Sequence, residues 1–246
     1  MVFKILRPFY LLYAYLMFIA GLLVIFPVVI VCVFLGQPTG GNIVIRLSRA
    51  WSDFWLFVIG IRQKHIVLEK DDADKNYVFI ANHCSYMDIP VIFQAIRYHN
   101  FRVLGKYEMS KIPVFGTLYK LAVILVDRSS PEKRARSLKN LVSSLNKHIS
   151  IFLFPEGTFN ESDIPMAKFF DGAFRTAIET QTDIKPFLFL DTIHRMHFRS
   201  VFTITPGINR ILHLPEVSVQ GLTMQDLPAL KERVHLLMSE AMLKYR

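Results

Sequence analysis

The chain has 246 residues, of which 52% are hydrophobic and 20% are charged. This composition is too apolar for a disordered chain and has too few charges for a coiled coil. The formal net charge is +9, which favours a partner that carries phosphate, such as an anionic lipid or a phosphorylated small molecule. We expect no nucleic acid partner, because the sequence has no zinc-finger spacing, no aromatic RNA-binding signature and no arginine-rich tail. The two cysteines, Cys32 and Cys84, are too few for a disulfide framework or a cysteine-rich zinc site.

The N-terminal part of the chain carries the excess of apolar residues. Residues 8–45 contain no Asp, Glu, Lys or Arg, and the apolar run extends from Pro8 to Gly36. This run is longer than the roughly 20 residues that cross a bilayer core. We interpret it as an uncleaved membrane anchor that either spans the membrane or dips into one leaflet. Basic residues outnumber acidic ones just after it, which predicts that the rest of the chain lies on the cytoplasmic face of the inner or plasma membrane.

A second, amphipathic helix is predicted after the breakers at residues 37–41. Its apolar face carries both tryptophans of the chain, and such a face suits the bilayer boundary, where indole rings are enriched. A helix packed on the protein core is the alternative. Residues 1–65 are therefore predicted to form a membrane anchor. The residues of the apolar face are Leu47, Trp51, Phe54, Trp55, Val58 and Ile61.

Beyond about residue 70, short apolar runs alternate with amphipathic stretches. This alternation predicts an α/β fold with a mixed, largely parallel sheet flanked by helices. The predicted strands are Tyr77–Ala81, Ala122–Val126, Ile151–Phe154, Ile184–Leu190, Phe202–Pro206 and Glu216–Gln220. The predicted helices are Ile89–Tyr98, Pro131–His148, Ala173–Thr180 and Leu227–Lys244.

The first motif with catalytic potential follows the first of these strands, where residues 82–88 read NHCSYMD. Ser85 and Asp88 have the spacing of a capping box, which predicts that a helix begins at Ser85. In a loop followed by a first helical turn, Asp88 can reach back to His83. A carboxylate that accepts the proton of one imidazole nitrogen leaves the other nitrogen free to take a proton from a hydroxyl. A capping Asp88 beside an uninvolved His83 is the alternative.

A second polar motif, Glu156-Gly157-Thr158, follows another predicted strand. Because ligands bind outside the carboxyl ends of strands in open α/β sheets, we expect this motif to converge with His83. Glu156 is suited to accept hydrogen bonds from hydroxyls, and Gly157 lets a substrate approach the backbone closely. A tight turn with an exposed Glu156 is the alternative.

Basic residues elsewhere are candidates for binding phosphate. Arg128 follows a predicted strand and is placed for a bidentate grip on phosphate, and Lys106 adds a point charge. A solvated surface pair, with Asp127 neutralising Arg128, is the alternative. The basic helix predicted over Pro131–His148 suits a membrane surface or the phosphates of a carrier cofactor, although a solvated helix face explains its charge as well.

The sequence gives no strong indication of a metal site. His194 and His197 are spaced as a possible pair of ligands, but no third ligand follows at a diagnostic spacing, and Arg195 and Arg199 flank the pair. We therefore expect no metal ion. Nucleophile elbows, Walker loops and dinucleotide fingerprints are also missing from the sequence.

Several motifs occur together in an order that resembles one known family, 1-acylglycerol-3-phosphate acyltransferase of phospholipid synthesis. The resemblance implies an acyltransferase catalytic domain over residues 66–246. It implies an enzyme that moves an acyl chain from acyl-CoA or acyl carrier protein to the free hydroxyl of lysophosphatidic acid, forming phosphatidic acid at the membrane. The motifs that carry the resemblance are NHCSYMD (82–88), KIPVFG (111–116), VDR (126–128), FPEGT (154–158) and IKPF (184–187).

The resemblance also implies a role for individual residues. His83 is the general base and Asp88 its partner, and no covalent enzyme intermediate is expected. No cofactor is implied beyond the acyl donor itself as co-substrate. The residues implied to bind the acceptor are Glu156, Gly157, Thr158, Arg128 and, less directly, Lys106, the last two at its phosphate.

Two positions depart from the family pattern. Phe159 and Asn160 follow Thr158, where the family commonly has Arg or Ser, and Lys185 stands in a block that often reads V-P-V. Three alternatives therefore stay open: an acyltransferase that acts on another lysophospholipid or a lyso-aminolipid, a membrane lipid-binding protein without catalysis, and a hydrolase.

Overall fold

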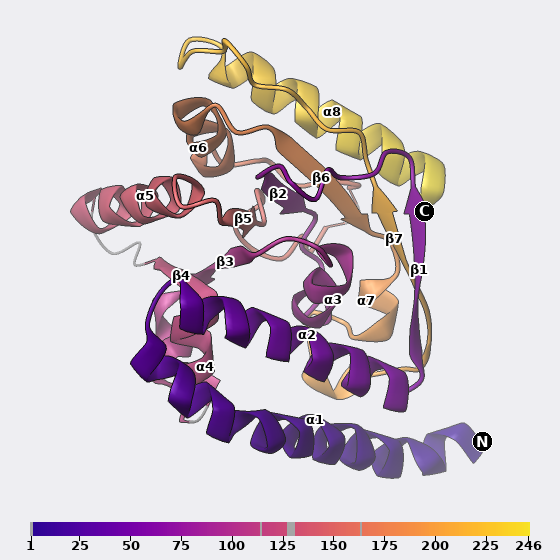
Figure 1. The fold of residues 1–246 in the computed structure, drawn as a ribbon. Helices are drawn as coiled ribbons and strands as arrows, with labels where there is room; N and C mark the ends of the chain where they lie inside the picture. Colours follow the sequence, from indigo (N-terminus) through magenta and orange to yellow (C-terminus); the bar gives the residue numbers. More distant parts are fainter. Residues whose placement is uncertain (1, 114, 127–130, 163) are drawn as a thin grey trace.

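The computed structural model describes residues 2–113, 115–126, 131–162 and 164–246, without the side chains of residues 2–5, 131, 133–136 and 138. A seven-stranded sheet lies at its centre, with helices on both faces (Figure 1). The strand order is β1-β7-β6-β2-β5-β3-β4. The strands are β1 (Ile61–Val67), β2 (Val78–Ala81), β3 (Phe101–Lys106), β4 (Val123–Val126), β5 (Ser150–Leu153), β6 (Ile184–Phe189) and β7 (Gly207–His213).

Most neighbouring strands of the sheet run parallel. β2 pairs in parallel with β5 and β6, and β3 pairs in parallel with β5 and β4. β7 is antiparallel to β6 and carries β1 at the edge. The predicted α/β fold with a mixed, largely parallel sheet is therefore confirmed. As a consequence, the carboxyl ends of five strands, β2 to β6, meet at one edge of the sheet, where ligands bind in such folds.

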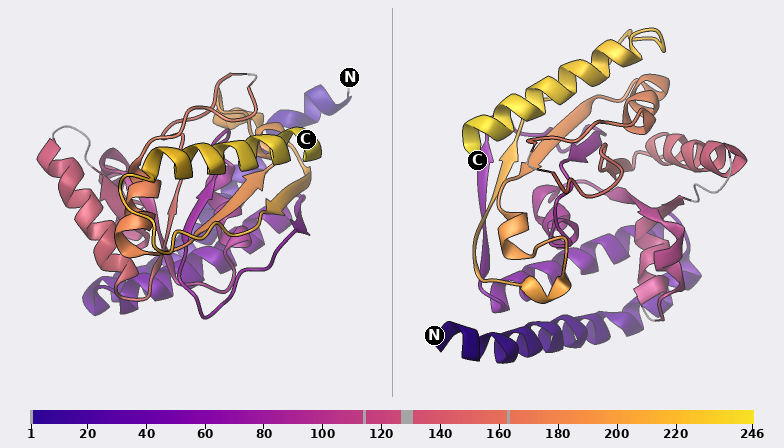
Figure 2. Two further views of the ribbon diagram at one scale, coloured as in Figure 1. Left: turned by 90° about the horizontal axis from the view of Figure 1, so that it is seen from above. Right: turned by 180° about the vertical axis from the view of Figure 1, so that it is seen from behind.

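Two apolar cores lie on opposite faces of this sheet. On β2, Phe79 and Ala81 belong to the core on the side of α2 and α3, whereas Val78 and Ile80 belong to the core on the side of α6 and α8, as strand alternation requires. Figure 2 shows the two helical layers from further directions. The helices that follow the first two strands are α3 (Asp88–Ala95), α4 (Phe115–Ala122), α5 (Pro131–Leu145), α6 (Gly172–Thr180), α7 (Thr192–Arg195) and α8 (Leu227–Tyr245).

The first two helices, α1 (Val2–Leu35) and α2 (Thr39–Val58), lie side by side along one side of the molecule (Figures 1 and 2). The indole of Trp55 is buried and donates to Ala14 O at 2.8 Å, and Trp51 Nε1 donates to Phe18 O at 3.2 Å. The two tryptophans of α2 therefore pack on α1, as the packed-helix alternative describes. That this face also lies at the bilayer boundary stays a prediction.

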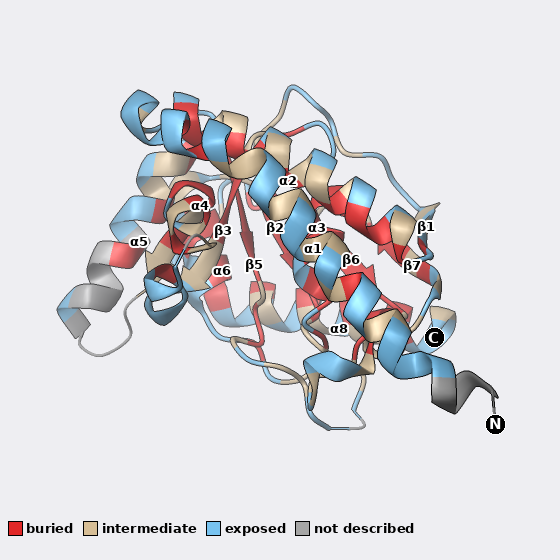
Figure 3. Cartoon of the chain, turned by 90° about the horizontal axis from the view of Figure 1, so that it is seen from below, coloured by how far each residue is buried: buried red, intermediate tan, exposed pale blue. Residues whose placement is uncertain are grey.

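The outward face of α1 is strongly apolar and exposed (Figure 3). Leu6–Leu35 is long and apolar enough to cross a membrane, and only 11% of its most apolar window is buried. Phe9 is 68% exposed and Phe34 is 86% exposed. The predicted long apolar helix is thus present. An exposed apolar surface of this size marks a site of contact with lipid or with another protein.

Two predicted strands are wrong. In place of a strand at Phe202–Pro206 there is a 3₁₀ turn at Val201–Thr203, and β7 begins only at Gly207. In place of a strand at Glu216–Gln220 there is one isolated bridge. Three strands, β1, β3 and β7, were not predicted, and β1 crosses the boundary drawn at residue 65. The division into an anchor and a catalytic domain stays a prediction.

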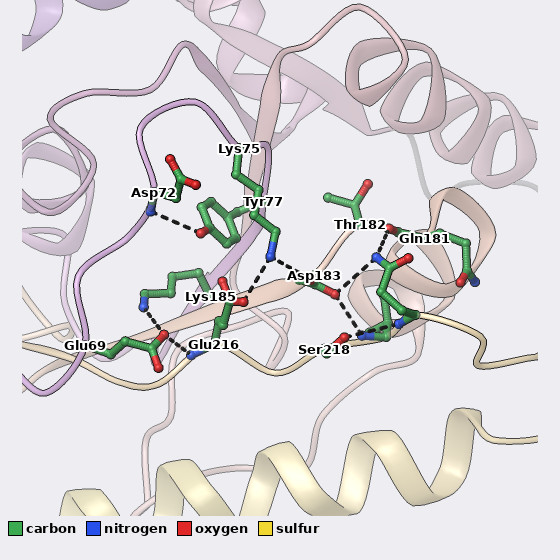
Figure 4. Close-up of polar contacts among 12 residues, drawn as sticks. Glu69, Asp72, Lys75, Tyr77, Gln181, Thr182, Asp183, Lys185, Glu216 and Ser218 are labelled. Carbon is green, nitrogen blue, oxygen red and sulfur yellow. Dashed lines mark hydrogen bonds and ion pairs between the residues drawn. The ribbon is translucent and has the colours of Figure 1, made fainter.

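A polar network ties loops to the amino-terminal edge of the sheet (Figure 4). Lys185 on β6 is fully buried, and its Nζ lies 2.9 Å from Glu69 Oε1. Lys75 Nζ lies 2.6 Å from Asp183 Oδ2 and 2.9 Å from Glu216 Oε1. Each of these charges has an opposite partner, so the network fixes the chain between β1 and β2 on the sheet. Lys185, at a departure from the family pattern, therefore has a structural role.

Candidate active site

The predicted pair of His83 and Asp88 is formed where β2 ends and α3 begins. His83 Nδ1 lies 2.8 Å from Asp88 Oδ2. The Asp88 side chain is fully buried, whereas that of His83 is 17% exposed. Because a carboxylate accepts the Nδ1 proton, the neutral imidazole carries no proton on Nε2. The exposed ring is thereby prepared to accept a proton from a bound hydroxyl.

The same Asp88 oxygen shapes the turn that carries His83. Oδ2 accepts the amide hydrogens of Cys84 at 2.8 Å and Ser85 at 2.9 Å. Ser85 Oγ accepts from Met87 N at 2.9 Å and donates to Met196 O. Ser85 therefore organises the helix start as predicted, although the helix begins at Asp88, three residues later. Asp88 in the first helical turn is also favoured by the helix dipole.

Two phenylalanine rings hold the imidazole of His83, and neither contact was predicted. The Phe154 ring stacks on it with centroids 3.8 Å apart and 9° between the planes. The Phe159 ring lies 4.3 Å away at 53°. These contacts restrict rotation of the imidazole, and an aromatic face also favours a positively charged neighbour. The signal in the sequence was the pair of phenylalanines that flank Pro155–Thr158.

Glu156 is buried directly behind His83 instead of being exposed in a turn. It is 2% exposed, and its Oε1 accepts the amide hydrogen of His83 at 2.9 Å. Its Oε2 accepts the amide hydrogen of Ala167, also at 2.9 Å. Burial raises the pKa of Glu156, and the two amide hydrogen bonds oppose this shift. The exposed-turn alternative is therefore wrong, and the carboxylate joins the loops after β2 and β5.

The remaining predicted acceptor residues lie at the same edge of the sheet. Gly157 has φ +70°, a conformation that favours glycine, and Thr158 is exposed. Lys106 is exposed at the carboxyl end of β3. Because β5 lies between β2 and β3, the backbones of these two strands are about 10 Å apart. Arg128 lies outside the described residues. The structure thus brings His83, Asp88 and Glu156 into contact and leaves the acceptor-binding roles as predictions.

The other basic and metal candidates do not join this cluster. The helix predicted over Pro131–His148 is present as α5 but ends at Leu145. Lys139 on it and Lys147 beyond it are exposed, and most of the other basic side chains lie outside the described residues. His197 Nδ1 accepts the amide hydrogen of Arg199 at 3.2 Å within its own turn. Among the residues that the structure describes, no three His, Cys, Asp or Glu side chains are placed to hold a metal ion. The expectation of no metal stays a prediction.

The amides around His83 are largely engaged within the protein. Those of His83, Cys84, Ser85, Met87 and Asp88 all donate to protein oxygens. These amides are therefore not free to stabilise an oxyanion.

Cys84 is not a competing nucleophile. Burial, together with the nearby Asp88 carboxylate, raises the pKa of its thiol well above the ordinary value. Its Sγ also lies 3.3 Å from Thr192 Oγ1. Because the thiolate and not the thiol is the nucleophile, this cysteine is unsuited to forming an acyl-enzyme.

The sequence around these residues matches a known family. An acyltransferase family model matches residues 61–189, which is more than half of the chain. The chain belongs to the acyltransferase family. The matched range runs from the first residue of β1 to the last residue of β6, so this acyltransferase contains His83, Asp88 and Glu156 within the shared region.

Relatives of this acyltransferase come from bacteria, plants and animals. A 1-acyl-sn-glycerol-3-phosphate acyltransferase of Borreliella burgdorferi is 31% identical over 187 residues, which cover 72% of this chain and 73% of the relative. The chloroplastic enzyme of that name from Arabidopsis thaliana is 28% identical over 145 residues, 58% of this chain. The alpha form from Homo sapiens is 27% identical over 180 residues, 72% of this chain. This chain covers 40% of the Arabidopsis relative and 62% of the human one.

A solved structure shares the fold of this acyltransferase. The 1-acyl-sn-glycerophosphate acyltransferase PlsC from Thermotoga maritima superposes with a TM-score of 0.75 at 22% sequence identity. The superposition covers 99% of this chain and 98% of that chain, so it includes the two N-terminal helices as well as the sheet.

Proposed function

We propose that this acyltransferase moves an acyl chain from an acyl thioester to the free hydroxyl of lysophosphatidic acid, forming phosphatidic acid at a membrane. The observation that carries the proposal is the buried Asp88 carboxylate 2.8 Å from His83 Nδ1, which prepares Nε2 as a base. The relatives named 1-acyl-sn-glycerol-3-phosphate acyltransferase support the choice of acceptor. The donor is acyl-CoA or acyl carrier protein.

The reaction needs one proton transfer and one bond exchange. His83 Nε2 takes the proton of the acceptor hydroxyl as its oxygen attacks the thioester carbonyl carbon. The C–S bond then breaks, and the departing thiolate takes the proton from the imidazolium, which leaves an ester and a free thiol. Because a thioester is already activated, general-base help, worth about 100- to 10,000-fold, and correct positioning are sufficient. Asp88 stabilises the imidazolium between the two steps.

We further propose that Glu156 acts by positioning, because both of its oxygens are occupied by amides and one of those amides belongs to His83. Gly157 and Thr158, at the exposed end of the same loop, are proposed to line the acceptor site. Arg128 and Lys106 are proposed to bind its phosphate. Lys106 ends β3, Arg128 follows the neighbouring β4 in the sequence, and two cations suit a doubly charged group.

Membrane association is proposed to come from α1. Its exposed apolar face, including Phe9 and Phe34, is best covered by lipid acyl chains. The excess of basic residues after the anchor favours the cytoplasmic face of the inner or plasma membrane. The lysolipid acceptor would then reach His83 from the bilayer.

The test measures thiol release from palmitoyl-CoA by the full chain in lipid vesicles, with lysophosphatidic acid, with a monoacylglycerol that lacks the phosphate, and without an acceptor. The proposal predicts release and phosphatidic acid formation with lysophosphatidic acid only. Equal thiol release with monoacylglycerol would show that the enzyme does not recognise the phosphate of the acceptor. It would favour another lysolipid as the acceptor. Release without acceptor would indicate a hydrolase, and acceptor binding without release would indicate a non-catalytic lipid-binding protein.

A further inference from the structure

The segment between β6 and β7 contacts the loop that carries His83. Thr192 Oγ1 lies 3.3 Å from Cys84 Sγ, and Met196 O accepts the Ser85 hydroxyl. Further along, the Phe198 ring lies 6.4 Å from the Phe159 ring, which itself packs on the His83 imidazole. This segment is therefore fixed to the active site by side chains and by backbone.

The other end of the same segment is fixed to the apolar helix α1. The Tyr15 hydroxyl donates to Val201 O at 2.6 Å, and Arg7 Nη2 donates to Phe202 O at 3.2 Å. The Tyr15 and Phe202 rings meet edge to face, with centroids 5.9 Å apart. Figures 1 and 2 show this stretch, after α7, beside the N-terminal half of α1.

Apolar side chains at this end remain exposed although they lie against α1. Phe202 is 64% exposed and Val201 is 37% exposed. Phe9, Leu12 and Leu16, on the half of α1 that includes Tyr15, are each more than half exposed. The apolar surface of α1 thus continues onto the segment. A partner that covers the apolar surface of α1 therefore also contacts the apolar side chains of the segment.

The segment, residues 190–206, carries a small excess of positive charge. It contains Arg195 and Arg199 against one acid, Asp191, and residues 197–202 contain no Asp or Glu. Arg210 pairs with Asp191, and Arg195 donates to Pro206 O. Arg199 is exposed, its guanidinium lies 5.6 Å from the centroid of the Phe198 ring, and within the described residues it has no carboxylate partner. An aromatic ring beside a basic residue suits the boundary of an anionic bilayer.

We propose that residues 197–202 form a second membrane contact, in which Phe202 enters the acyl region beside α1 and Arg199 binds lipid phosphate groups. The inference rests on the proposed membrane insertion of α1. A bilayer with anionic headgroups is the occupant that fits both the continuity with α1 and the absence of acidic residues from residues 197–202. Because the same segment is bonded to the His83 loop, this contact places His83 at the depth of the headgroups, where an acceptor hydroxyl lies.

The exposed aromatic residues of the chain provide a matched test. Phe202 and Phe170 are both 64% exposed, but Phe170 adjoins α6 on the opposite face of the sheet from α1. Phe202→Trp and Phe170→Trp are made in the full chain and reconstituted with phosphatidylcholine that carries brominated acyl chains. The emission of Trp51 and Trp55 in the unchanged protein is subtracted. We expect strong quenching of the additional emission at position 202 and little at position 170. Equal quenching at the two positions would overturn the inference.

A third variant, Phe9→Trp, separates this inference from the proposed function. Phe9 is exposed on α1 itself, so its tryptophan is quenched wherever α1 lies in the bilayer. Quenching at position 9 without quenching at position 202 would refute the second contact and leave the membrane anchor intact. No quenching at either position would refute both. Acyl donor is omitted, so the result does not depend on catalysis.

The charge of the contact is tested with Arg199→Glu and the control Arg233→Glu, which changes an exposed arginine on α8. Both are combined with Phe202→Trp and compared in phosphatidylcholine with and without phosphatidylglycerol. We expect phosphatidylglycerol to increase quenching in the control but not in Arg199→Glu. The same increase in both would show that Arg199 does not bind lipid phosphate. If a soluble protein abolished the quenching at position 202, that protein would compete with the bilayer for residues 197–202. This result would indicate a protein partner and contradict the proposal.

Discussion

Asp88 holds His83 and the backbone of the turn beside it through a single oxygen, Oδ2, which accepts from His83 Nδ1 and from the amides of Cys84 and Ser85. The other oxygen, Oδ1, is buried without a hydrogen-bond partner among the described residues. The carboxylate therefore fixes both the tautomer of the imidazole and the position of the loop. The charge of Asp88 and its shape contribute separately, and a substitution distinguishes them.

Asp88→Asn keeps the shape of the side chain and removes its charge. The amide cannot both accept from His83 Nδ1 and stabilise an imidazolium, so we expect kcat to fall about 100- to 10,000-fold, the usual worth of general-base help. The KM for lysophosphatidic acid should change little. Thiol release at saturating acceptor measures kcat. The control is Asp171→Asn, which removes a surface ion pair with Lys231. A kcat equal to that of the unchanged protein would contradict the role of the carboxylate.

Phe154→Leu removes the ring that stacks on His83 at 3.8 Å. An aromatic pair is worth about 0.5–1.5 kcal/mol beyond its buried area, so we expect kcat to fall roughly 2- to 10-fold with the fold retained. Phe169→Leu is the control, because Phe169 stacks on Phe174 away from the site. It should lower thermal stability and leave the kcat of the folded protein unchanged. The stacking has no catalytic effect if the two variants have the same kcat.

Glu156→Gln leaves one acceptor oxygen for the two amides of His83 and Ala167. One amide then faces the NH₂ group of Gln, and we expect the free energy of unfolding to fall by about 1–3 kcal/mol. The kcat should fall as well, because the backbone of His83 shifts. Thermal unfolding and thiol release are measured beside Glu161→Gln, which changes an exposed acid in the same loop. Unchanged stability in Glu156→Gln would show that the bridge between the loops is unimportant.

His213 predicts a specific pH dependence of stability. It is buried on β7, with Nε2 2.9 Å from His65 Nδ1. Burial, together with the positive charges of the neighbouring His65 and Lys185, lowers its pKa from 6.5 to about 4, and the charge of Asp71 opposes this shift. The folded state therefore binds fewer protons than the unfolded state between these values. The stability due to the neutral ring is complete above pH 6.5 and is lost as the pH falls toward 4.

The slope expected from His213 is at most about 1.4 kcal/mol per pH unit. Unfolding by denaturant in detergent micelles is compared for the unchanged protein and His213→Gln across this range. We expect the stability of the unchanged protein to fall more steeply with acid, so that the difference between the two shrinks. Parallel curves would show that His213 is not neutral in the folded state.

The sequence predicted those parts of the fold whose signal is local. β2, β5 and β6 are continuous apolar runs because both of their faces are covered, and they were placed to within a residue or two at each end. β1 was not predicted because its residues include Arg62, Gln63 and Lys64 on an edge strand that is largely exposed. β7 contains Asn209 and Arg210, whose side chains are paired with residues far away in sequence.

The same distinction applies to the site. His83 and Asp88 are five residues apart, so their contact follows from one turn, and it was predicted. The bond from Glu156 to the His83 amide joins the ends of two strands 73 residues apart, and the stacking of Phe154 on His83 depends on the same pairing of β2 with β5. Neither contact has a local signal beyond the polarity of the motif and the two phenylalanines that flank it. The packing of Trp55 against α1 was given only as the alternative for the same reason, since an amphipathic pattern does not say what covers its apolar face.

The central claim is that His83 removes the proton from the acceptor hydroxyl, and His83→Gln tests it most directly. The measurement is thiol release from palmitoyl-CoA with lysophosphatidic acid in vesicles. In a second sample, His83→Gln is combined with Phe9→Trp, and quenching of the new tryptophan by brominated lipid confirms that the variant still enters the membrane. The account predicts a loss of about 100- to 10,000-fold in turnover with membrane binding unchanged. Turnover close to that of the unchanged protein, in a variant that folds and binds membranes normally, would contradict it.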